Sequence, residues 1–314
     1  MGYAKRMKVA VYLSGIPAKS KNQQKRKALT DFAQGVTAAG DQVIFVDDYN
    51  TVDCDIAVIQ GWVNSKAGAH LKIRGDAIDR QRREGKHIVA IDSNLLGFLA
   101  PNDFNRYLRY SLDGIFPTTG YYFDQAIDPA RWTSIKLNYG FEERPWSKDG
   151  KRILICLQRN GGWSMGQTSV PEWLNSTIAQ LRKHTDREIV VRPHPGNLEI
   201  VKQLKINDSR TILSQAHDIR DDLNQAWATI TYNSSPGVAS LLWGVPVWVT
   251  DPEPQKSQVC AWAEKDLARI ETPQYPDRQE FYHRLGQCHF NSDELTNGTA
   301  WRFMRQRLPN TSCQ

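Results

Sequence analysis

Short hydrophobic runs alternate with longer amphipathic stretches along the first half of the chain. Strand-like runs lie at 8–13, 42–46, 56–60 and 86–91. Helical periodicity covers 23–39 and 67–84, and Gly40 and Gly85 follow these stretches, where a glycine commonly ends a helix. Strands separated by helices in this way predict a parallel, doubly wound sheet.

The alternation stops over 101–150, which is rich in aromatic and turn-forming residues, and 138–150 has the composition of a linker. Strand-like runs then lie at 152–157, 188–192, 211–213, 229–232 and 245–249. Helical stretches lie at 171–183, 198–204, 219–226, 238–243 and, in two pieces, 277–308. The restarted pattern predicts an α/β fold of two Rossmann-like doubly wound domains facing a cleft. We expect the domains at 1–145 and 146–280, followed by C-terminal helices at 281–314.

The composition suits a protein of two ordinary domains, with 314 residues, 40% hydrophobic and 24% charged. No apolar run approaches the roughly 18–20 residues that span a bilayer, and the run at 9–13 is too short for a signal peptide. The five cysteines lack CxxC spacing, which indicates reduced thiols, a cytoplasmic location and no zinc or iron–sulfur site.

The charge is positive and uneven, with a formal net charge of +6 and a pI of about 9.0. Before the first acid, Asp31, come the cations Lys5, Arg6, Lys8, Lys19, Lys21, Lys25, Arg26 and Lys27. A second basic stretch contains Lys72, Arg74, Arg80, Arg82, Arg83 and Lys86. Clustered cations fit a nucleic-acid partner. A solvated surface with a nucleotide pocket explains them equally.

The most informative segment is 229–250, where a strand enters the polar turn Asn233-Ser234-Ser235. Pro236 and Gly237 then open an apolar helix. The unpaired N–H groups and the dipole of a helix N-terminus favour an anion, so this turn is a candidate phosphate site. The alternative is an ordinary strand–helix connection with a capping serine.

Two other strand ends carry cationic side chains. The strand at 188–192 ends in Arg192-Pro-His-Pro-Gly, where two prolines fix the backbone around His194. Arg192 can clamp a phosphate and His194 can donate to one, although a rigid turn with ordinary surface side chains is the alternative. Arg159 follows the strand at 152–157 and precedes Gly161 and Gly162. The predicted fold brings these strand ends to one edge.

The Arg-Pro-His-Pro element, the Ser-Ser turn and the following Gly-x-Pro and strand resemble the GT-B glycosyltransferases over roughly 150–255. The likeness is to the donor domain of bacterial capsule, Kdo and polysialic-acid transferases and of glycerophosphotransferases. It implies that His194, Ser234 and Ser235 hold the phosphates of a nucleotide-sugar, with Arg159, Arg192 and Gly237 around them. It also implies that the C-terminal helices pack back on the N-terminal, acceptor-binding domain.

One position departs from the pattern. Many relatives carry an acid five residues before the glycine of Gly-x-Pro, and here that residue is Ala239. Recognition of the ribose would then come from elsewhere, for example from Asp251 or Glu253.

An inverting transfer also needs a general base on the acceptor side. The first candidate is Asp92, at the end of the strand at 86–91, although it can equally cap a helix at Leu95. Asp47 and Asp48 are the reserve candidates.

The segment 104–123 interleaves arginines with aromatic residues, which is a pattern that binds phosphates and stacks bases. We expect nucleic-acid contacts from Arg106, Arg109 and Tyr121 and, after the first strand, from Lys19 and Lys21. The alternative for 104–123 is packing between domains. In overall character the chain resembles phage enzymes that glycosylate hydroxymethylated bases, which must leave the stack to react.

These observations predict an inverting glycosyltransferase that moves a sugar from a nucleotide-sugar, most simply a UDP-sugar, to a hydroxymethylpyrimidine in double-stranded DNA. No prosthetic group is expected, and the lack of a DxD motif at a strand end favours transfer without a metal. The alternatives are a glycosyltransferase or glycerophosphotransferase acting on a surface polysaccharide or glycolipid, and a non-catalytic nucleic-acid-binding module. The oligomeric state is open.

Overall fold

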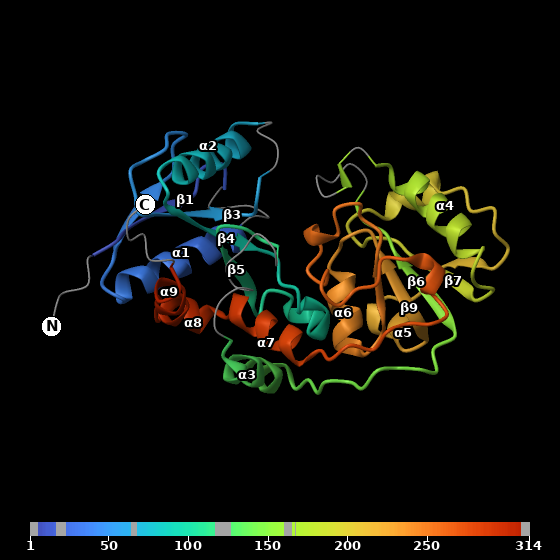
Figure 1. Ribbon diagram of the computed structural model, residues 1–314. Coiled ribbons are helices and arrows are strands. Elements are labelled where there is room, and N and C mark those ends of the chain that lie inside the picture. The colour runs from blue at the N-terminus through green and yellow to red at the C-terminus, as the bar shows by residue number, and fades with distance from the viewer. Residues whose placement is uncertain are drawn as a thin grey trace. The chain divides into compact units, whose positions relative to one another are not determined.

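The computed structural model describes residues 6–16, 23–63, 68–116, 127–159, 165–166 and 168–308. It divides into two compact units (Figure 1). Unit 1 contains Met1–Ile127 and Arg284–Gln314, and unit 2 contains Asp128–His283. Each unit is built on its own sheet, so each is described by itself. In the part of the chain that the structure describes, every helix is too short or too polar to cross a bilayer.

Unit 1 has a six-stranded sheet of order β11-β5-β4-β3-β1-β2. Its strands are β1 (Lys8–Tyr12), β2 (Gln42–Val46), β3 (Ile56–Gln60), β4 (His87–Asp92), β5 (Leu108–Leu112) and β11 (His289–Phe290). The first four pair in parallel, and β5 pairs antiparallel with both β4 and β11. Alternate residues of β1 face opposite sides, so Val9 and Val11 pack beneath α1 (Gln23–Ala38), while Ala10 packs beneath α2 (Ala69–Arg83).

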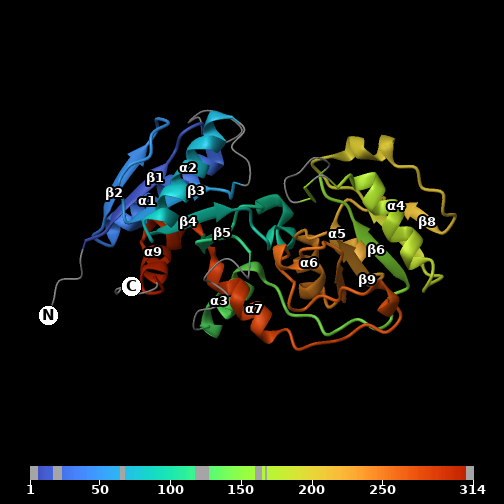
Figure 2. The same ribbon diagram turned by 45° about the horizontal axis from the view of Figure 1, so that its top comes forward.

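The C-terminal helices belong to unit 1 and complete its core (Figures 1 and 2). Helices α8 (Ser292–Thr296) and α9 (Thr299–Arg305) pack against α1. Gly35 of α1 permits this approach, because a Cβ atom there would lie 1.9 Å from the carbonyl oxygen of Leu295. The buried ring of Phe32 stacks on Tyr110 and meets the edge of Trp301.

Unit 2 has a fully parallel five-stranded sheet of order β10-β9-β6-β7-β8. Its strands are β6 (Arg152–Cys156), β7 (Glu188–Arg192), β8 (Thr211–Leu213), β9 (Ala226–Thr231) and β10 (Val247–Val249). Its helices include α3 (Pro129–Tyr139), α4 (Val170–Leu181), α5 (Ile219–Leu223) and α6 (Pro236–Trp243). The strand order reverses between β6 and β9, and ligands of doubly wound sheets bind at the carboxyl edge beside such a reversal.

The structure departs from the expected elements mainly over 101–150. The sequence showed no regular period there, but residues 108–112 form β5 and residues 129–139 form α3. The boundary between the units lies between Ile127 and Asp128, just before α3, whereas we expected it at residue 145. Trp132 of α3 stacks on Tyr282 with ring centroids 5.5 Å apart, and Arg278 donates a 2.6 Å hydrogen bond to the carbonyl oxygen of Arg144. These contacts fix the expected linker to unit 2.

Two smaller differences concern helix type and number. Leu198–Gln203 is a 3-10 helix rather than an α-helix. The C-terminal region contains α7 (Gln279–Cys288), the short strand β11, α8 and α9, where two helical pieces were expected. The short strand escaped detection because two residues carry no periodicity.

Candidate functional site

Three neighbouring strands of unit 2 end at the same level of the sheet. Cys156 at the end of β6 is aligned with Arg192 of β7 on one side and with Thr231 of β9 on the other. The residues that follow these ends emerge along one carboxyl edge, and they include Arg159, His194, Ser234 and Ser235. This edge holds the strand reversal between β6 and β9.

His194 is half-buried and held in one orientation. Its Nδ1 accepts a 2.9 Å hydrogen bond from the backbone N–H of Gly196. In the neutral ring the proton therefore sits on Nε2, which can donate a hydrogen bond. Burial lowers the pKa of His194, and the positive charge of Arg159 nearby lowers it further. At neutral pH His194 is thus a neutral N–H donor beside a cation.

Arg159 is exposed and lies against the His194 turn. A Cβ atom on Gly196 would lie only 2.6 Å from Nη2 of Arg159, so glycine leaves room for the guanidinium. A guanidinium and a neutral imidazole donor side by side form a pair suited to phosphate oxygens.

The Ser234-Ser235 turn leads into α6 without using either hydroxyl as a cap. Ser235 occupies the N-cap position but makes no side-chain capping bond. The Oγ atom of Ser234 is buried and has no hydrogen-bond partner among the described residues. A buried hydroxyl without a partner is uncommon and carries a free-energy cost, which a ligand can remove. The structure therefore disfavours the alternative of a capping serine.

A chain of amides holds this turn in place. Gln158, directly after β6, accepts a 2.9 Å hydrogen bond at Oε1 from the backbone N–H of Asn233. Asn233 in turn donates from Nδ2 to Oδ2 of Asp251 at 2.5 Å. All three side chains are buried. The sequence placed Asn233 in the candidate turn but did not predict the bracing role of Gln158 and Asn233, although both follow the ends of predicted strands.

Asp251 and Gly237 have structural contacts beside the Ser234-Ser235 turn. Asp251 is buried, and its Oδ1 also accepts a 2.8 Å hydrogen bond from the N–H of Glu253, so both carboxylate oxygens are engaged. A Cβ atom on Gly237 would lie 2.9 Å from Cγ2 of Val259, so Gly237 allows α6 to pack closely. Both residues help to shape the turn and its helix, and their expected roles in ribose and phosphate binding stay predictions.

Arg192 also differs from the expected phosphate clamp. Its Nη1 donates to the carbonyl oxygen of Ala216 at 2.9 Å and to Oδ2 of Asp222 at 2.6 Å. Its Nη2 donates to the carbonyl oxygen of His217 at 2.9 Å. Asp222 additionally accepts from Ser214. The guanidinium of Arg192 therefore fixes the segment between β8 and α5.

In unit 1, Asp92 ends β4 and forms an ion pair across the sheet. Its Oδ2 lies 2.6 Å from Nη2 of Arg109, the residue aligned with it on β5. Its Oδ1 accepts a 2.7 Å hydrogen bond from the N–H of Ser93. The following 3-10 helix, Gly97–Leu99, has no side-chain cap, and it is Asn94 whose Oδ1 accepts a 2.8 Å hydrogen bond from the N–H of Leu96 just before it. Asp92, with 24% of its side chain exposed, is thus an oriented carboxylate that solvent reaches.

The reserve acids lie after β2. Asp47 pairs with Arg26 at 2.7 Å, and this hydrogen bond holds the pKa of Asp47 below its ordinary value. Oδ1 of Asp48 accepts a 3.1 Å hydrogen bond from the N–H of Asn50. A carboxylate whose pKa is lowered in this way is a weaker base, so Asp47 is less suited to take a proton.

Of the five residues expected to contact nucleic acid, three lie outside the described residues and the other two form ion pairs within unit 1. Lys19, Lys21 and Tyr121 lie outside the described residues. Arg109 is only 4% exposed and serves the ion pair with Asp92. Arg106 forms an ion pair with Asp103 at 3.0 Å. The aromatic residues Tyr107 and Tyr110 of this segment are buried within unit 1, so their rings are not exposed for stacking on bases, and the alternative of packing between domains stays a prediction.

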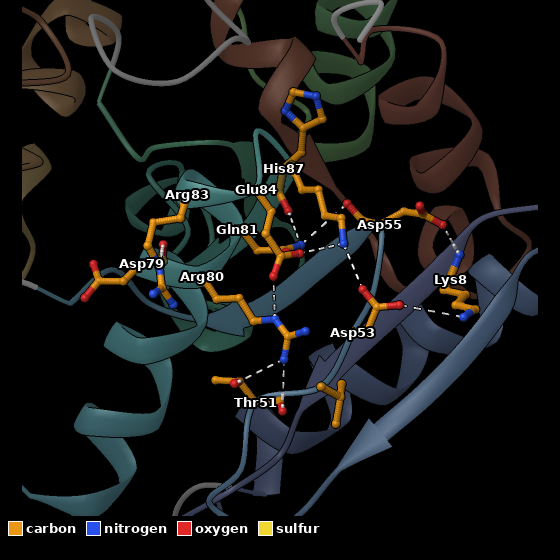
Figure 3. A network of polar contacts seen from close by, with 12 residues as sticks. Lys8, Thr51, Asp53, Asp55, Asp79, Arg80, Gln81, Arg83, Glu84 and His87 are labelled. Carbon is orange, nitrogen blue, oxygen red and sulfur yellow. Dashed lines mark hydrogen bonds and ion pairs between the residues drawn. The ribbon is translucent and has the colours of Figure 1, made fainter.

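The second basic stretch is largely engaged within unit 1 (Figure 3). Arg80 pairs with Glu84 at 2.9 Å, and Lys86 lies between Glu84 and Asp53 at 2.6 and 2.9 Å. Lys72 pairs with Asp76 at 2.6 Å. These internal pairs weaken the case for a polyanion at this stretch.

A metal site is equally unsupported by the described side chains, since no three histidine, cysteine or acidic residues among them are grouped to hold an ion.

Comparisons with known proteins support the fold and leave the family open. No family model matches the chain, and no curated protein matches it. Among solved structures it is similar to the beta Kdo 2,4 transferase of Thermosulfurimonas dismutans KpsC, with a TM-score of 0.57 and 14% identity over 93% of this chain and 99% of the other. It is also similar to the beta Kdo 2,7 transferase of the same KpsC, with a TM-score of 0.51 and 12% identity over 94% and 99%. The α/β fold is therefore GT-B-like.

Proposed function

We propose that the protein is a glycosyltransferase that moves a sugar from a nucleotide-sugar to a hydroxyl of a saccharide acceptor, in a surface polysaccharide or glycolipid. The observation that carries the proposal is that Arg159, His194 and Ser234 follow the ends of three neighbouring strands at the carboxyl edge beside the strand reversal of unit 2, with Arg159 against the His194 turn. The GT-B-like fold and its likeness to Kdo transferases support the same reaction class.

The donor's phosphate fits the chemistry of this group. The guanidinium of Arg159 supplies charge and directed N–H groups, and Nε2–H of His194 supplies a neutral donor beside it. The hydroxyl of Ser234 would gain the partner that it lacks among the described residues. Hydrogen-bond donors that are already oriented before the reaction stabilise the negative charge that develops on a leaving phosphate.

Transfer requires one bond to form and one to break. The acceptor oxygen bonds to the anomeric carbon of the sugar while the bond from that carbon to the donor's phosphate oxygen breaks. The electron pair of the broken bond stays on the phosphate, which leaves with the nucleotide. The proton of the acceptor hydroxyl goes to a general base, and Asp92 is our candidate because its carboxylate is oriented and reached by solvent. This scheme inverts the anomeric centre.

The choice of acceptor follows from the described cations. Arg109 is buried in an ion pair, Arg106 is paired with Asp103, and the cations of the second basic stretch are largely paired within unit 1. A protein that binds duplex DNA neutralises backbone phosphates with its own Lys and Arg side chains, which displaces the counterions of the DNA. A saccharide makes no such demand, so we rank it above hydroxymethylated DNA.

The first test is transfer from radiolabelled UDP-, CMP- and GDP-sugars to a panel of acceptors. The panel contains capsular and lipid-linked oligosaccharides, and DNA with 5-hydroxymethylcytosine, 5-hydroxymethyluracil or neither. We expect label on a saccharide. Label only on hydroxymethylated DNA would show that the protein is a glycosyltransferase whose acceptor is DNA. The absence of both sugar transfer and donor hydrolysis with every donor would overturn the proposal.

Variants then test the phosphate group directly. Ser234→Ala removes only the buried hydroxyl, and we expect the donor's KM to rise about tenfold, the effect of losing one hydrogen bond to a charged group. Ser176→Ala is the matched control, because Ser176 is an exposed serine on α4 of the same unit. Equal KM values in the two variants would remove Ser234 from the site.

A further inference from the structure

Unit 1 contains a cavity of about 720 Å³ between the connection that follows β2 and the exposed face of α2. Tyr49 and Asn50 line it from the connection, and Asp76, Asp79 and Arg83 line it from the helix. The three helical residues are spaced by three and four positions, so they share one face of α2. The described strand-end residues of the candidate site do not line this cavity.

We propose that this cavity is a second saccharide-binding site, which holds a part of the acceptor chain away from the reacting hydroxyl. The proposal rests on the proposed function for its role, because it names where a saccharide acceptor is gripped. It assigns to the cavity the chemical class of a neutral oligosaccharide.

The side chains of the cavity suit sugar rings. Tyr49 is 55% exposed, so its ring is accessible as a flat apolar surface with a polar tip. A pyranose has an apolar face of C–H groups and a rim of hydroxyls, which need both a flat surface and polar partners. Carboxylates accept two hydroxyl hydrogen bonds and guanidiniums donate several, and Asp79 and Arg83 offer both kinds of group on neighbouring turns.

The charge of the cavity argues against a polyanion. Its acids Asp76 and Asp79 balance its bases Arg82 and Arg83, so its lining carries no net charge. A phosphate backbone placed here would meet no net positive charge, so the lining would give it no net electrostatic attraction. Figure 3 shows Asp79 and Arg83 near each other on α2, on a different side of the helix from the contact of Arg80 with Thr51.

The two walls of the cavity are tied together before any ligand binds. Nη1 of Arg80 donates to the carbonyl oxygen of Thr51 at 3.3 Å and to its Oγ1 at 3.4 Å. The hydroxyl of Tyr12 accepts a 3.3 Å hydrogen bond from the N–H of Val52. Lys86 pairs with Asp53 further along the same connection. Binding would therefore cost little ordering of the backbone that carries Tyr49.

The test is binding of the full-length protein to an array of bacterial surface oligosaccharides of graded length, with a duplex DNA oligonucleotide as a separate probe. We expect the wild type to bind a subset of the oligosaccharides, Tyr49→Ala to lose affinity about tenfold, and Tyr49→Phe to retain it because the ring remains. Phe45→Ala is the matched control, since Phe45 is also 55% exposed but does not line the cavity.

The outcomes separate this proposal from the proposed function. Ser234→Ala should bind the array like the wild type, because it changes only the donor site. Tyr49-dependent binding without any sugar transfer would support the cavity and contradict the transferase. If the Tyr49→Ala variant transfers sugar to saccharides of every length as fast as the wild type does, the proposed function stands. The proposal that the cavity binds the acceptor would then be wrong. Absence of oligosaccharide binding by the wild type, or Tyr49-dependent binding of DNA instead, would also overturn it.

Discussion

The indole N–H of Trp301 donates a 2.7 Å hydrogen bond to Oδ2 of Asp41, a residue 260 positions earlier in the chain. Both side chains are buried in unit 1. Asp41 also accepts hydrogen bonds from the N–H of Met7 at 2.9 Å and from Nη1 of Arg305 at 2.8 Å. One carboxylate thus joins the start of the sheet to the last described helix.

Trp301→Phe should destabilise unit 1 by about 2–4 kcal/mol, because it removes a hydrogen bond to a buried charge and leaves a cavity beside Phe32. Hydrogen exchange localised by mass spectrometry should show lost protection in α1 and α9. Leu137→Ala, at a side chain 76% exposed on α3, is the control and should leave exchange unchanged. Equal protection in both variants would show that the contact contributes little.

Arg159 and Arg192 should respond differently to replacement by lysine. Arg159→Lys should raise the donor's KM by about tenfold or more and leave stability intact, because Arg159 is exposed. Arg192→Lys should lower stability by about 2–3 kcal/mol, because lysine cannot reach Ala216, His217 and Asp222 together. Thermal unfolding and donor titration of both variants check this. A donor-binding loss limited to Arg192→Lys would restore Arg192 as the phosphate clamp.

Asp92→Asn should abolish transfer while donor binding persists, because the amide cannot take the acceptor's proton. It also leaves the buried charge of Arg109 without its carboxylate, so we expect a stability loss of about 2–3 kcal/mol. Single-turnover transfer is therefore measured well below the unfolding temperature of the variant, with donor affinity measured in parallel. Turnover at the wild-type rate would exclude Asp92 as the base, and no turnover in the wild type would favour a binding module.

The lowered pKa of His194 predicts a specific pH dependence of stability. Below about pH 6.5 the unfolded chain takes up a proton at this histidine more readily than the folded protein, so stability falls as the pH decreases. His194→Gln lacks this proton uptake. Denaturant unfolding at pH 7.5, 6.5 and 5.5 should therefore show a steeper loss for the wild type than for the variant. Parallel losses would mean that burial and Arg159 do not perturb the imidazole.

Much of the donor edge was predictable from the chain because local rules governed it. Pro193 and Pro195 restrict the backbone around His194 whatever surrounds them, and Pro236 and Gly244 mark the ends of α6. Strand–helix alternation then predicted the four parallel strands of the first sheet and the five strands of the second. The roles of Arg192 and Asp251 were not predictable in this way, because their partners Asp222 and Asn233 become neighbours only through the strand order.

The region 101–150 shows the limit of periodicity more clearly. Strand β5 contains Arg109, whose charge suggested a surface, yet the antiparallel pairing with β4 places it opposite Asp92 in the interior. Helix α3 has a weak apolar pattern, and its buried Trp132 stacks on Tyr282, far away in the sequence. Contacts between residues so distant in the chain leave no local signal in the sequence.

Unit 1 is assembled from the beginning and the end of the chain, whereas unit 2 is one continuous stretch. During synthesis the ribosome must therefore release Trp301 before Phe32 and Asp41 find their native partners. Unit 2 can complete its sheet first. Until α8 and α9 are synthesised, part of the apolar surface of the first strands and α1 of unit 1 stays uncovered. Chaperone dependence of the nascent chain should accordingly concentrate on the strands of unit 1 that precede unit 2.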